Sequence, residues 1–320
     1  MPDAMSMHKP FDDPVYPFWG IILCGIYGGT FYWGIDQVNI QRVLGAKNLD
    51  HARWGAMFAI LLKLTPAFIF ALPGVIAFAL YPGLKDARHA FVVILNNLLP
   101  DGVRGYVLSA LVGAIVSALI AVMNSIATMS VRDFALHFIP DLGDRAQVRL
   151  GRIAILVAAA LGVGGAFLVA LQPEGIYKYL ITISVYLIMP IAPAIVFGIM
   201  SRGVTYAGAV ASVVVGVVLS GAFMADTYLT YADIAADRFF PWLHTPLTTN
   251  YTWRGLWGTV AITAVLFLVS ACTKKTDPAR LAQTTIAWGG RWEPFRGMAD
   301  WRLHLVVLLA ATAAAYAWLW

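Results

Sequence analysis

Six polar or charged side chains interrupt two of the most apolar stretches of the chain. Lys63 lies near the middle of the run from Trp54 to Leu80, which is long enough to cross a bilayer. A charge there costs at least about 2.5 to 3.5 kcal/mol on insertion scales, so it marks a functional site with a partner to be found. The other five polar or charged residues lie at the end of the apolar run that begins at Phe18: Asp36, Gln37, Asn39, Gln41 and Arg42.

Asp36 and Lys63 are predicted to neutralise one another across two neighbouring helices, because pairing lowers the cost of holding either charge in a low dielectric. The alternative is an interfacial Asp with long cationic side chains that extend toward water. That alternative suits Arg42 and Lys47 but not Lys63, which lies too far from either end of its run. A buried ammonium facing a carboxylate therefore indicates a polar crevice through which a small solute could cross.

The composition requires a membrane to hold this site. The chain has 320 residues, of which 60% are hydrophobic and 12% charged, and its mean hydropathy is +0.75. Soluble domains carry roughly 25% charged residues. Continuous apolar runs rather than ten-residue alternation predict an all-α polytopic helix bundle and not a β-barrel. About eight runs approach the length needed to cross the membrane: Phe18–Val38, Trp54–Leu80, Tyr106–Ser130, Ile153–Leu171, Ile176–Met200, Val204–Met224, Leu256–Cys272 and Leu303–Trp320.

Several other classes of function are excluded by residue type. Cys24 and Cys272 give neither a disulfide framework nor the spacing of metal ligands. We find no Ser/His/Asp or Cys/His cluster, so the chain is not expected to be an enzyme. The net charge of +5 follows the topology and implies no nucleic acid: one set of alternate loops holds fourteen Lys and Arg residues and the other seven. Both termini are therefore predicted to be external, in a plasma (inner) membrane protein embedded in the lipid bilayer.

An external N-terminus must be carried across the membrane. The first 17 residues, MPDAMSMHKPFDDPVYP, contain no apolar segment that could act as a signal peptide for this step. We therefore expect the chain to be the C-terminal part of a longer protein, or a truncated reading frame. Between the spans, Ala90 to Leu99 predicts a short external helix, and Asp226 to Trp253 an external loop rich in aromatic residues. The segment from Thr273 to Arg302 is predicted to be cytoplasmic.

Glycine is frequent in the first span, at positions 25, 28, 29 and 34. Glycine lowers helix propensity, so its presence there needs a reason. One reading is close packing of helices through small residues. The other is a discontinuous helix whose freed backbone groups line a cavity for a solute. The sequence alone favours neither.

Three segments carry a resemblance to a known family. They are YWGIDQVNIQRVLGAKN from Tyr32, LLKLTPAFIFALPGVIA around Lys63, and AIVSALIAVMNSIATMSVRDF from Ala114. In this order they resemble the sodium:solute symporter family, which includes the sodium/glucose cotransporters. The resemblance implies a LeuT-type architecture of two inverted repeats. On that basis the chain forms one transmembrane domain that lacks the first repeat, which could be encoded separately: an external tail (1–17), second-repeat core helices (18–200) and three peripheral helices (201–320).

The resemblance also implies roles for individual residues. Tyr32 matches the tyrosine that closes the solute site from the cytoplasmic side, and Trp33 the aromatic that stacks near a sugar. Lys63 matches a buried lysine that contacts the solute or its polar neighbours. Asp36 and Gln37 match an Asp-Gln pair of the cotransporter branch.

A sodium site is implied on the third span. Ala114 corresponds to a carbonyl ligand and Ser117 to the first of two adjacent hydroxyl ligands. Ala118 occupies the second hydroxyl position, so the site is incomplete. Apart from this possible coupling ion we expect no cofactor.

The solute is a small organic molecule whose identity stays open. Sugar carriers of the family place a polar residue where this chain has Gly29, and a glutamine near Thr182. Each lost polar contact weakens polyol recognition by about 1 kcal/mol or more, so the solute is sugar-like, polyol-like or neither. The predicted function is sodium-coupled symport by alternating access. The alternatives are a membrane sensor or assembly subunit that transports nothing, and an inactive remnant.

Overall fold

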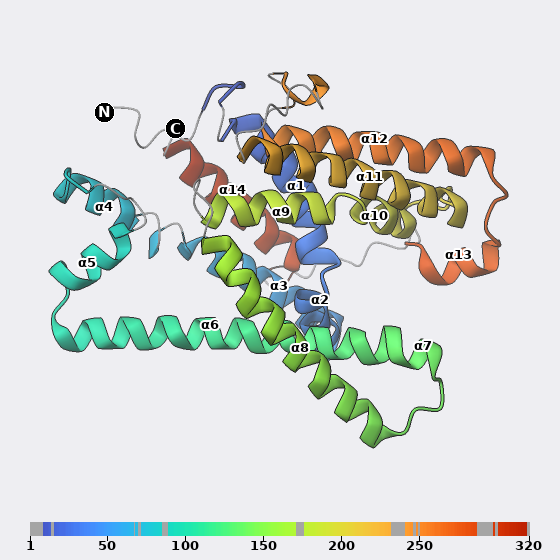
Figure 1. Cartoon of the computed structure of the whole chain (residues 1–320), viewed down its shortest axis with the longest axis horizontal. Helices are drawn as coiled ribbons and strands as arrows, with labels where there is room; N and C mark the ends of the chain where they lie inside the picture. Colours follow the sequence, from blue (N-terminus) through green and yellow to red (C-terminus); the bar gives the residue numbers. More distant parts are fainter. Residues whose placement is uncertain are drawn as a thin grey trace. The chain divides into compact units, whose positions relative to one another are not determined.

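The regular elements of the computed structural model are all helical in the part of the chain that it describes (Figure 1). This outcome confirms the all-α prediction. The described residues are 9–13, 16–66, 68–69, 72–84, 89–170, 176–231, 241–245, 248, 250–286, 297 and 300–318.

The chain divides into two compact units. The first comprises Met1–Asn39, Tyr177–Ala299 and Ala313–Trp320, and the second Ile40–Ile176 and Asp300–Thr312. Helices α2 (Gln37–Leu44) and α14 (Trp301–Trp318) run across the boundary. The first unit holds α1 (Phe18–Gly34), α9 (Ile176–Ile188), α10 (Ala192–Met200), α11 (Tyr206–Tyr231), η6 (Pro241–Leu243), α12 (Tyr251–Cys272) and α13 (Pro278–Thr284). The second holds α3 (Leu49–Lys63), α4 (Leu72–Leu80), α5 (Ala90–Leu98), α6 (Asp101–Met129), η4 (Ser130–Ala135), α7 (Leu136–Phe138) and α8 (Asp144–Ala170).

In the first unit, α11 and α12 lie side by side (Figure 1). Small residues let the two backbones approach, as is typical of helix pairs in membranes. On α11 they recur every fourth position and are buried: Gly208, Ser212, Gly216 and Ser220. The start of α11 is tied to the end of α12 by the Thr205 and Thr273 hydroxyls, which lie 2.7 Å apart.

The apolar core of this unit surrounds the junction of α9 and α10. Tyr186 of α9 and Met189 just after it are almost completely buried, and they share a cluster with Phe223 of α11 and Ile262 of α12. The α9–α10 pair bends by 51° around Met189–Ile191. Pro190 has no N–H to donate to the preceding turn, so it explains the break.

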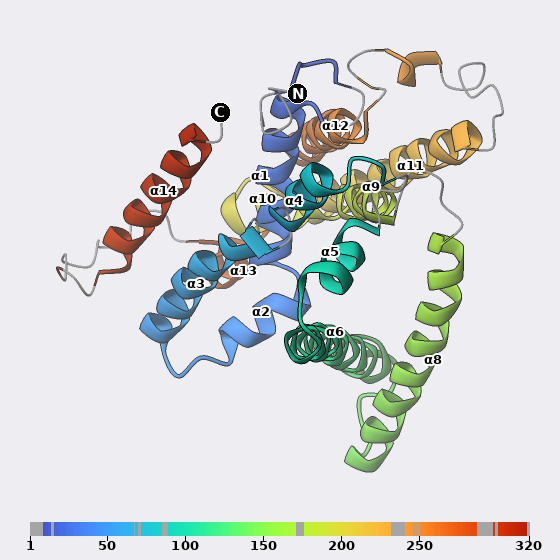
Figure 2. The same cartoon turned by 90° about the vertical axis from the view of Figure 1, so that its left-hand side faces the viewer.

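In the second unit, α6 packs on α8, and the two helices cross (Figures 1 and 2). Helix α6 continues through the π-helical turn η4 into α7. Only 6% of the apolar window of α6 or α8 is buried, against 28% for α11 and α12. The apolar faces of α6 and α8 are thus left for lipid or further protein to cover.

Four helical segments among the described residues are long and apolar enough to cross a membrane, and six if each bent pair counts as one. They correspond to six of the eight predicted runs. The four are Asp101–Phe138, Asp144–Phe167, Tyr206–Thr230 and Tyr251–Cys272. The second predicted run is divided between α3 and α4, and the last matches the shorter apolar helix Trp301–Ala314.

The position of Lys63 differs from the expectation. It is the last residue of α3 rather than a mid-helix position. Pro66 follows closely and has no N–H to donate to the Leu62 carbonyl, so regular helical bonding is interrupted here.

The two predicted connecting segments have different outcomes. The short helix expected at Ala90–Leu99 is present as α5. The external loop does not begin at Asp226, because α11 continues to Tyr231 and the Asp226 side chain is fully buried. A buried Asp is stable in a helix only when it is paired, and its partner is described below.

Candidate functional site

The first apolar run is broken where its polar residues begin, with a 50° bend between α1 and α2. The N–H groups of Ile35 and Asp36 both donate to the Phe31 carbonyl, at 2.9 and 3.0 Å. In a regular helix the Asp36 N–H would reach the Tyr32 carbonyl instead. The Asn39 side chain fills that vacancy, since its Nδ2 donates to the Tyr32 oxygen at 2.9 Å.

This break supports the discontinuous-helix reading of the glycines. Gly34 is the last residue of α1, directly before the break. A Cβ added at Gly25, Gly28 or Gly29 would meet no atom of the described residues within 4 Å. Those positions therefore make no close helix contact there, whereas Gly20, which the glycine argument did not use, packs against Thr252 of α12.

The two aromatic residues predicted to contact a solute occupy the last turn of α1. Tyr32 and Trp33 meet edge to face, with ring centroids 5.2 Å apart, and each is 47% exposed. Gly29 lies one turn earlier, on the same helix. An exposed aromatic pair beside an interrupted backbone can stack on the apolar face of a small solute while freed polar groups bind its hydroxyls.

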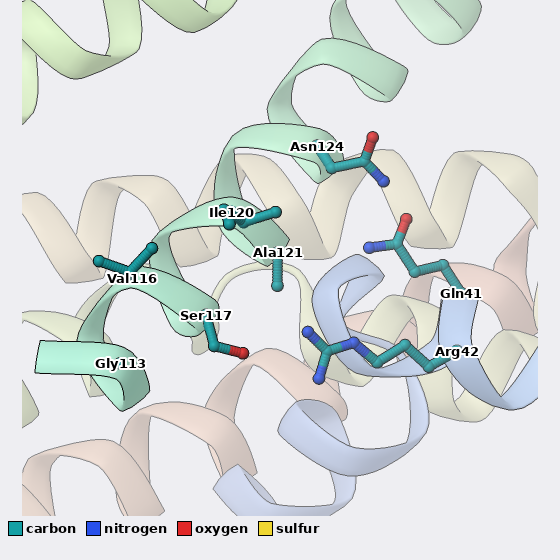
Figure 3. Close-up of a pocket in the computed structure, with 8 residues that line it drawn as sticks. All are labelled: Gln41, Arg42, Gly113, Val116, Ser117, Ile120, Ala121 and Asn124. Carbon is teal, nitrogen blue, oxygen red and sulfur yellow. The ribbon is translucent and has the colours of Figure 1, made fainter. Parts of the chain in front are cut away.

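A separate hollow of about 740 Å³ lies within the second unit, between α2 and α6 (Figure 3). Three predicted residues line it: Gln41, Arg42 and Ser117. Figure 3 shows the Arg42 side chain directed toward Ser117, and Gln41 toward Asn124. The other lining residues are Gly113, Val116, Ile120, Ala121 and Asn124.

Gln41 also ties α2 to α6. Its Nε2 donates to the Ser125 hydroxyl at 2.9 Å, and that hydroxyl donates to the Ala121 carbonyl at 3.0 Å. Ser125 is 1% exposed, so this bond is shielded from water. The sequence reasoning missed Asn124 and Ser125, although they follow Ser117 and Ala121 at helical spacing and could have been found by that periodicity.

The predicted sodium residues are on one turn of α6 but do not all face the hollow. Ser117 lines it, whereas Ala114 and Ala118 do not and are exposed. No group of three or more metal-ligating His, Cys, Asp or Glu side chains occurs among the residues that the structure describes. The sodium site therefore stays a prediction.

The remaining predicted residues are distributed along the chain. Asp36 belongs to the first unit and Lys63 to the second, so their ion pair stays a prediction. Gln37 is the first residue of α2 and is half-buried. Thr182 of α9 is 5% exposed, and its hydroxyl donates to the Lys178 carbonyl at 2.8 Å. This hydroxyl can accept a bond from a solute, but its own proton is already used.

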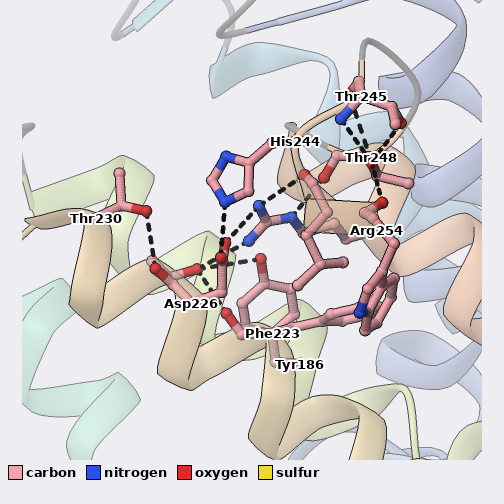
Figure 4. Close-up of polar contacts among 11 residues, drawn as sticks. Tyr186, Phe223, Asp226, Thr230, His244, Thr245, Thr248 and Arg254 are labelled. Carbon is pink, nitrogen blue, oxygen red and sulfur yellow. Dashed lines mark hydrogen bonds and ion pairs between the residues drawn. The ribbon is translucent and has the colours of Figure 1, made fainter. Parts of the chain in front are cut away.

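A second polar cluster, which the sequence reasoning missed, joins α11, α12 and the segment between them (Figure 4). Arg254 Nη2 lies 2.7 Å from Asp226 Oδ2, and His244 Nε2 lies 2.9 Å from Asp226 Oδ1. Arg254 also donates to the carbonyls of Leu243 and Thr248. Asp226 and Arg254 are 0% and 5% exposed. Each of the three guanidinium nitrogens of Arg254 has an acceptor, so the cluster is a structural clamp rather than an open site.

These features define an integral membrane protein built from apolar helices, two of them broken at polar or proline-containing positions. The comparison with known families gives the same answer: the model of the sodium:solute symporter family matches residues 4–216. The chain belongs to the sodium:solute symporter family, as its motifs predicted. That family consists of transporters and not of enzymes.

Characterised relatives are similar over much of this chain. The sodium/myo-inositol cotransporter 2 of Mus musculus is 26% identical over 305 residues, which are 89% of this chain and 45% of the relative. The sodium/glucose cotransporter 4 of Danio rerio is 30% identical over 240 residues, 68% of this chain and 36% of the relative. The sodium/mannose cotransporter of Bos taurus is 28% identical over 65% of this chain and 38% of its own length. The chain thus spans less than half the length of these relatives.

Proposed function

We propose that this chain forms the C-terminal part of a symporter that couples a sodium ion to the movement of a small polyhydroxylated solute. The break between α1 and α2 carries the proposal, because it places exposed Tyr32 and Trp33 directly beside an interruption of the helix. Broken helices are the usual binding elements of secondary transporters, which move a solute by alternating access. The names of the relatives support a sugar or polyol as solute and sodium as the coupling ion.

The proposal includes a partner and an orientation. A separately encoded N-terminal half would supply the first repeat, and both termini would face the outside of the plasma (inner) membrane. The low burial of α6 and α8 supports a protein or lipid partner on their apolar faces. The competing functions are a sensor or assembly subunit that keeps the fold and moves nothing, and an inactive remnant.

Uptake by proteoliposomes tests the proposal. The chain is reconstituted alone and together with the product of the adjacent upstream coding region, and a panel of myo-inositol, mannose, glucose and non-sugar solutes is offered with and without a sodium gradient. Uptake of a polyol or sugar that depends on sodium is expected in at least one preparation. Specific binding without uptake in either preparation would favour the sensor. A complete absence of both would favour the remnant.

A further inference from the structure

We propose that Asn39 is a positioning residue: it holds the bend between α1 and α2 and so sets the direction in which Tyr32 and Trp33 face. The inference rests on the proposed function, in which these rings contact the solute. It concerns a residue that the motif comparison left without a role, between the Asp-Gln pair and Gln41.

The hydrogen bonds around the break show why a side chain is needed there. The Asp36 N–H has moved from the Tyr32 carbonyl to that of Phe31, which leaves the Tyr32 oxygen without its helical donor. In an apolar setting an unpaired carbonyl favours return to the straight helix, where the donor is restored. Asn39 removes this preference by donating to Tyr32 from the first turn of α2.

The geometry fixes the orientation of the Asn39 amide. Its Nδ2 donates to the Tyr32 carbonyl at 2.9 Å and also lies 3.3 Å from Asp36 Oδ2. Both partners are acceptors, so only the NH₂ end of the amide can face them. The two bonds join the end of α1, the break and the start of α2 through one side chain. Leu, Ala and Asp at this position cannot make the bond to Tyr32, because none of them offers an N–H.

The consequence for the rings follows from their place on α1. Tyr32 is bonded directly by Asn39, and Trp33 is the next residue, in the last turn before the break. A change of the 50° bend therefore tilts that turn and both rings with respect to α2. A solute that contacts the rings and the polar residues of α2 would lose affinity if the angle were no longer fixed.

The bend can be measured without transport. Spin labels are placed at Ile26→Cys on α1 and Leu44→Cys on α2, which are 64% and 76% exposed, in a Cys272→Ser background that leaves only the buried Cys24. Asn39→Leu, which is close in volume but has no donor, is expected to broaden the distance distribution and lengthen its mean. Asn39→Gln keeps an amide donor and should stay near the parent. Gln37→Leu is the matched control: it also removes a side-chain amide, but one that does not bond to the Tyr32 carbonyl. It should leave the distance distribution unchanged.

The proposal is overturned if Asn39→Leu gives the parent distribution, or if Gln37→Leu broadens it equally. Should Asn39→Leu fail to fold, Asn39→Ala carries the same comparison. The uptake assay then separates positioning from folding: Asn39→Leu is expected to raise KM roughly tenfold, or about 1.4 kcal/mol, with Asn39→Gln restoring it. A purely structural role would lower the maximal rate and leave KM unchanged. Absence of uptake in every variant counts against the proposed function, while the distance distributions still decide the role of Asn39.

Discussion

At the scale of single residues, Lys63 ends α3, where the last carbonyl groups of the helix present the negative end of its dipole. A cation is favoured at that end, so the helix itself reduces the cost that an ammonium would meet in mid-span. The residue is also exposed in this structure. The charge therefore stabilises the end of a helix, and its contact with a solute stays a prediction.

The substitution Lys63→Ala is expected to abolish solute uptake in the preparation that transports, because it removes the ammonium from the predicted solute site. Uptake is measured as initial rate against solute concentration in proteoliposomes. Lys47→Ala is the control, since Lys47 lies beyond the polar residues of α2 and is exposed. Normal rate and affinity in Lys63→Ala would contradict the assignment of this residue.

Ala118→Ser is expected to increase the apparent affinity for sodium, because it adds the oxygen that the implied site lacks. One added ligand worth about 1 kcal/mol corresponds to a roughly fivefold change in the sodium concentration for half-maximal flux. Ala118→Val adds volume without an oxygen and is expected to give no increase. An unchanged sodium dependence in Ala118→Ser would argue against a sodium site on this turn of α6.

At the scale of elements, α11 and α12 form the best-packed pair of the described structure. Gly216 lies against the α9–α10 bend: a Cβ there would fall 2.6 Å from the Pro190 Cα and 3.1 Å from Ile262 Cδ1. At Gly208 a Cβ would fall 2.7 Å from the Leu266 carbonyl oxygen. Backbone atoms cannot move aside as a flexible side chain can, so these glycines are required by close approach.

Gly216→Ala is therefore expected to destabilise the protein by about 1–3 kcal/mol, the usual cost of overpacking. Gly221→Ala is the matched control on the same helix, because its Cβ would meet no described atom within 4 Å. That control should be neutral or slightly stabilising, since Ala is the better helix former. Thermal unfolding of both variants in the same detergent gives the comparison. Equal melting temperatures would contradict the packing argument.

The clamp of Asp226, His244 and Arg254 joins α11, α12 and the described residues around His244. Removal of one partner leaves an uncompensated buried charge, so Asp226→Asn is expected to cost about 3–5 kcal/mol. Asp50→Asn is the control: its contact with Arg53 is 3.6 Å and both side chains are partly exposed, where such pairs are worth at most about 1 kcal/mol. Chemical or thermal denaturation measures both. A loss no larger than that of Asp50→Asn would show that the clamp contributes little.

At the scale of the whole molecule, the loop charges predict which side of the membrane each end faces. Cys272 ends α12 and is exposed, at the start of the predicted cytoplasmic segment, whereas Cys24 is buried. In intact cells, Cys272 should resist a membrane-impermeant thiol reagent and react once the membrane is opened. Asp12→Cys, in the predicted external tail, should react without opening. Labelling of Cys272 from outside would reverse the predicted orientation.

The sequence predicted the helical class and six of the runs that could cross the membrane, because apolar length is a local property. It predicted neither the end of α3 at Lys63 nor the continuation of α11 past Asp226 to Tyr231. The break after Lys63 depends on Pro66, whose effect on the backbone a count of apolar residues does not register. The extension of α11 depends on Arg254, 28 positions later, and such pairings become visible only when the helices are brought together.

The candidate site was predicted in part for the same reason. The residues of one chain segment, from Tyr32 to Arg42, were recognised as a group, and the structure places a helix break inside that group. The role of Asn39 was not recognised, because it follows from one displaced backbone bond and not from residue type. Asn124 and Ser125 lie within the third motif but were given no role, because only the three positions of the implied sodium site on that helix were considered.

The seam between α11 and α12 has one more consequence. Two helices whose backbones approach closely at Gly208, and whose opposite ends are joined by hydroxyl and charge contacts, have almost no freedom to slide. They form a rigid pair, and the α9–α10 bend at Pro190 is packed against it at Gly216. Structures determined with and without bound solute should therefore be superposed on α11 and α12. Movements of the other helices are then measured against a pair that keeps its geometry.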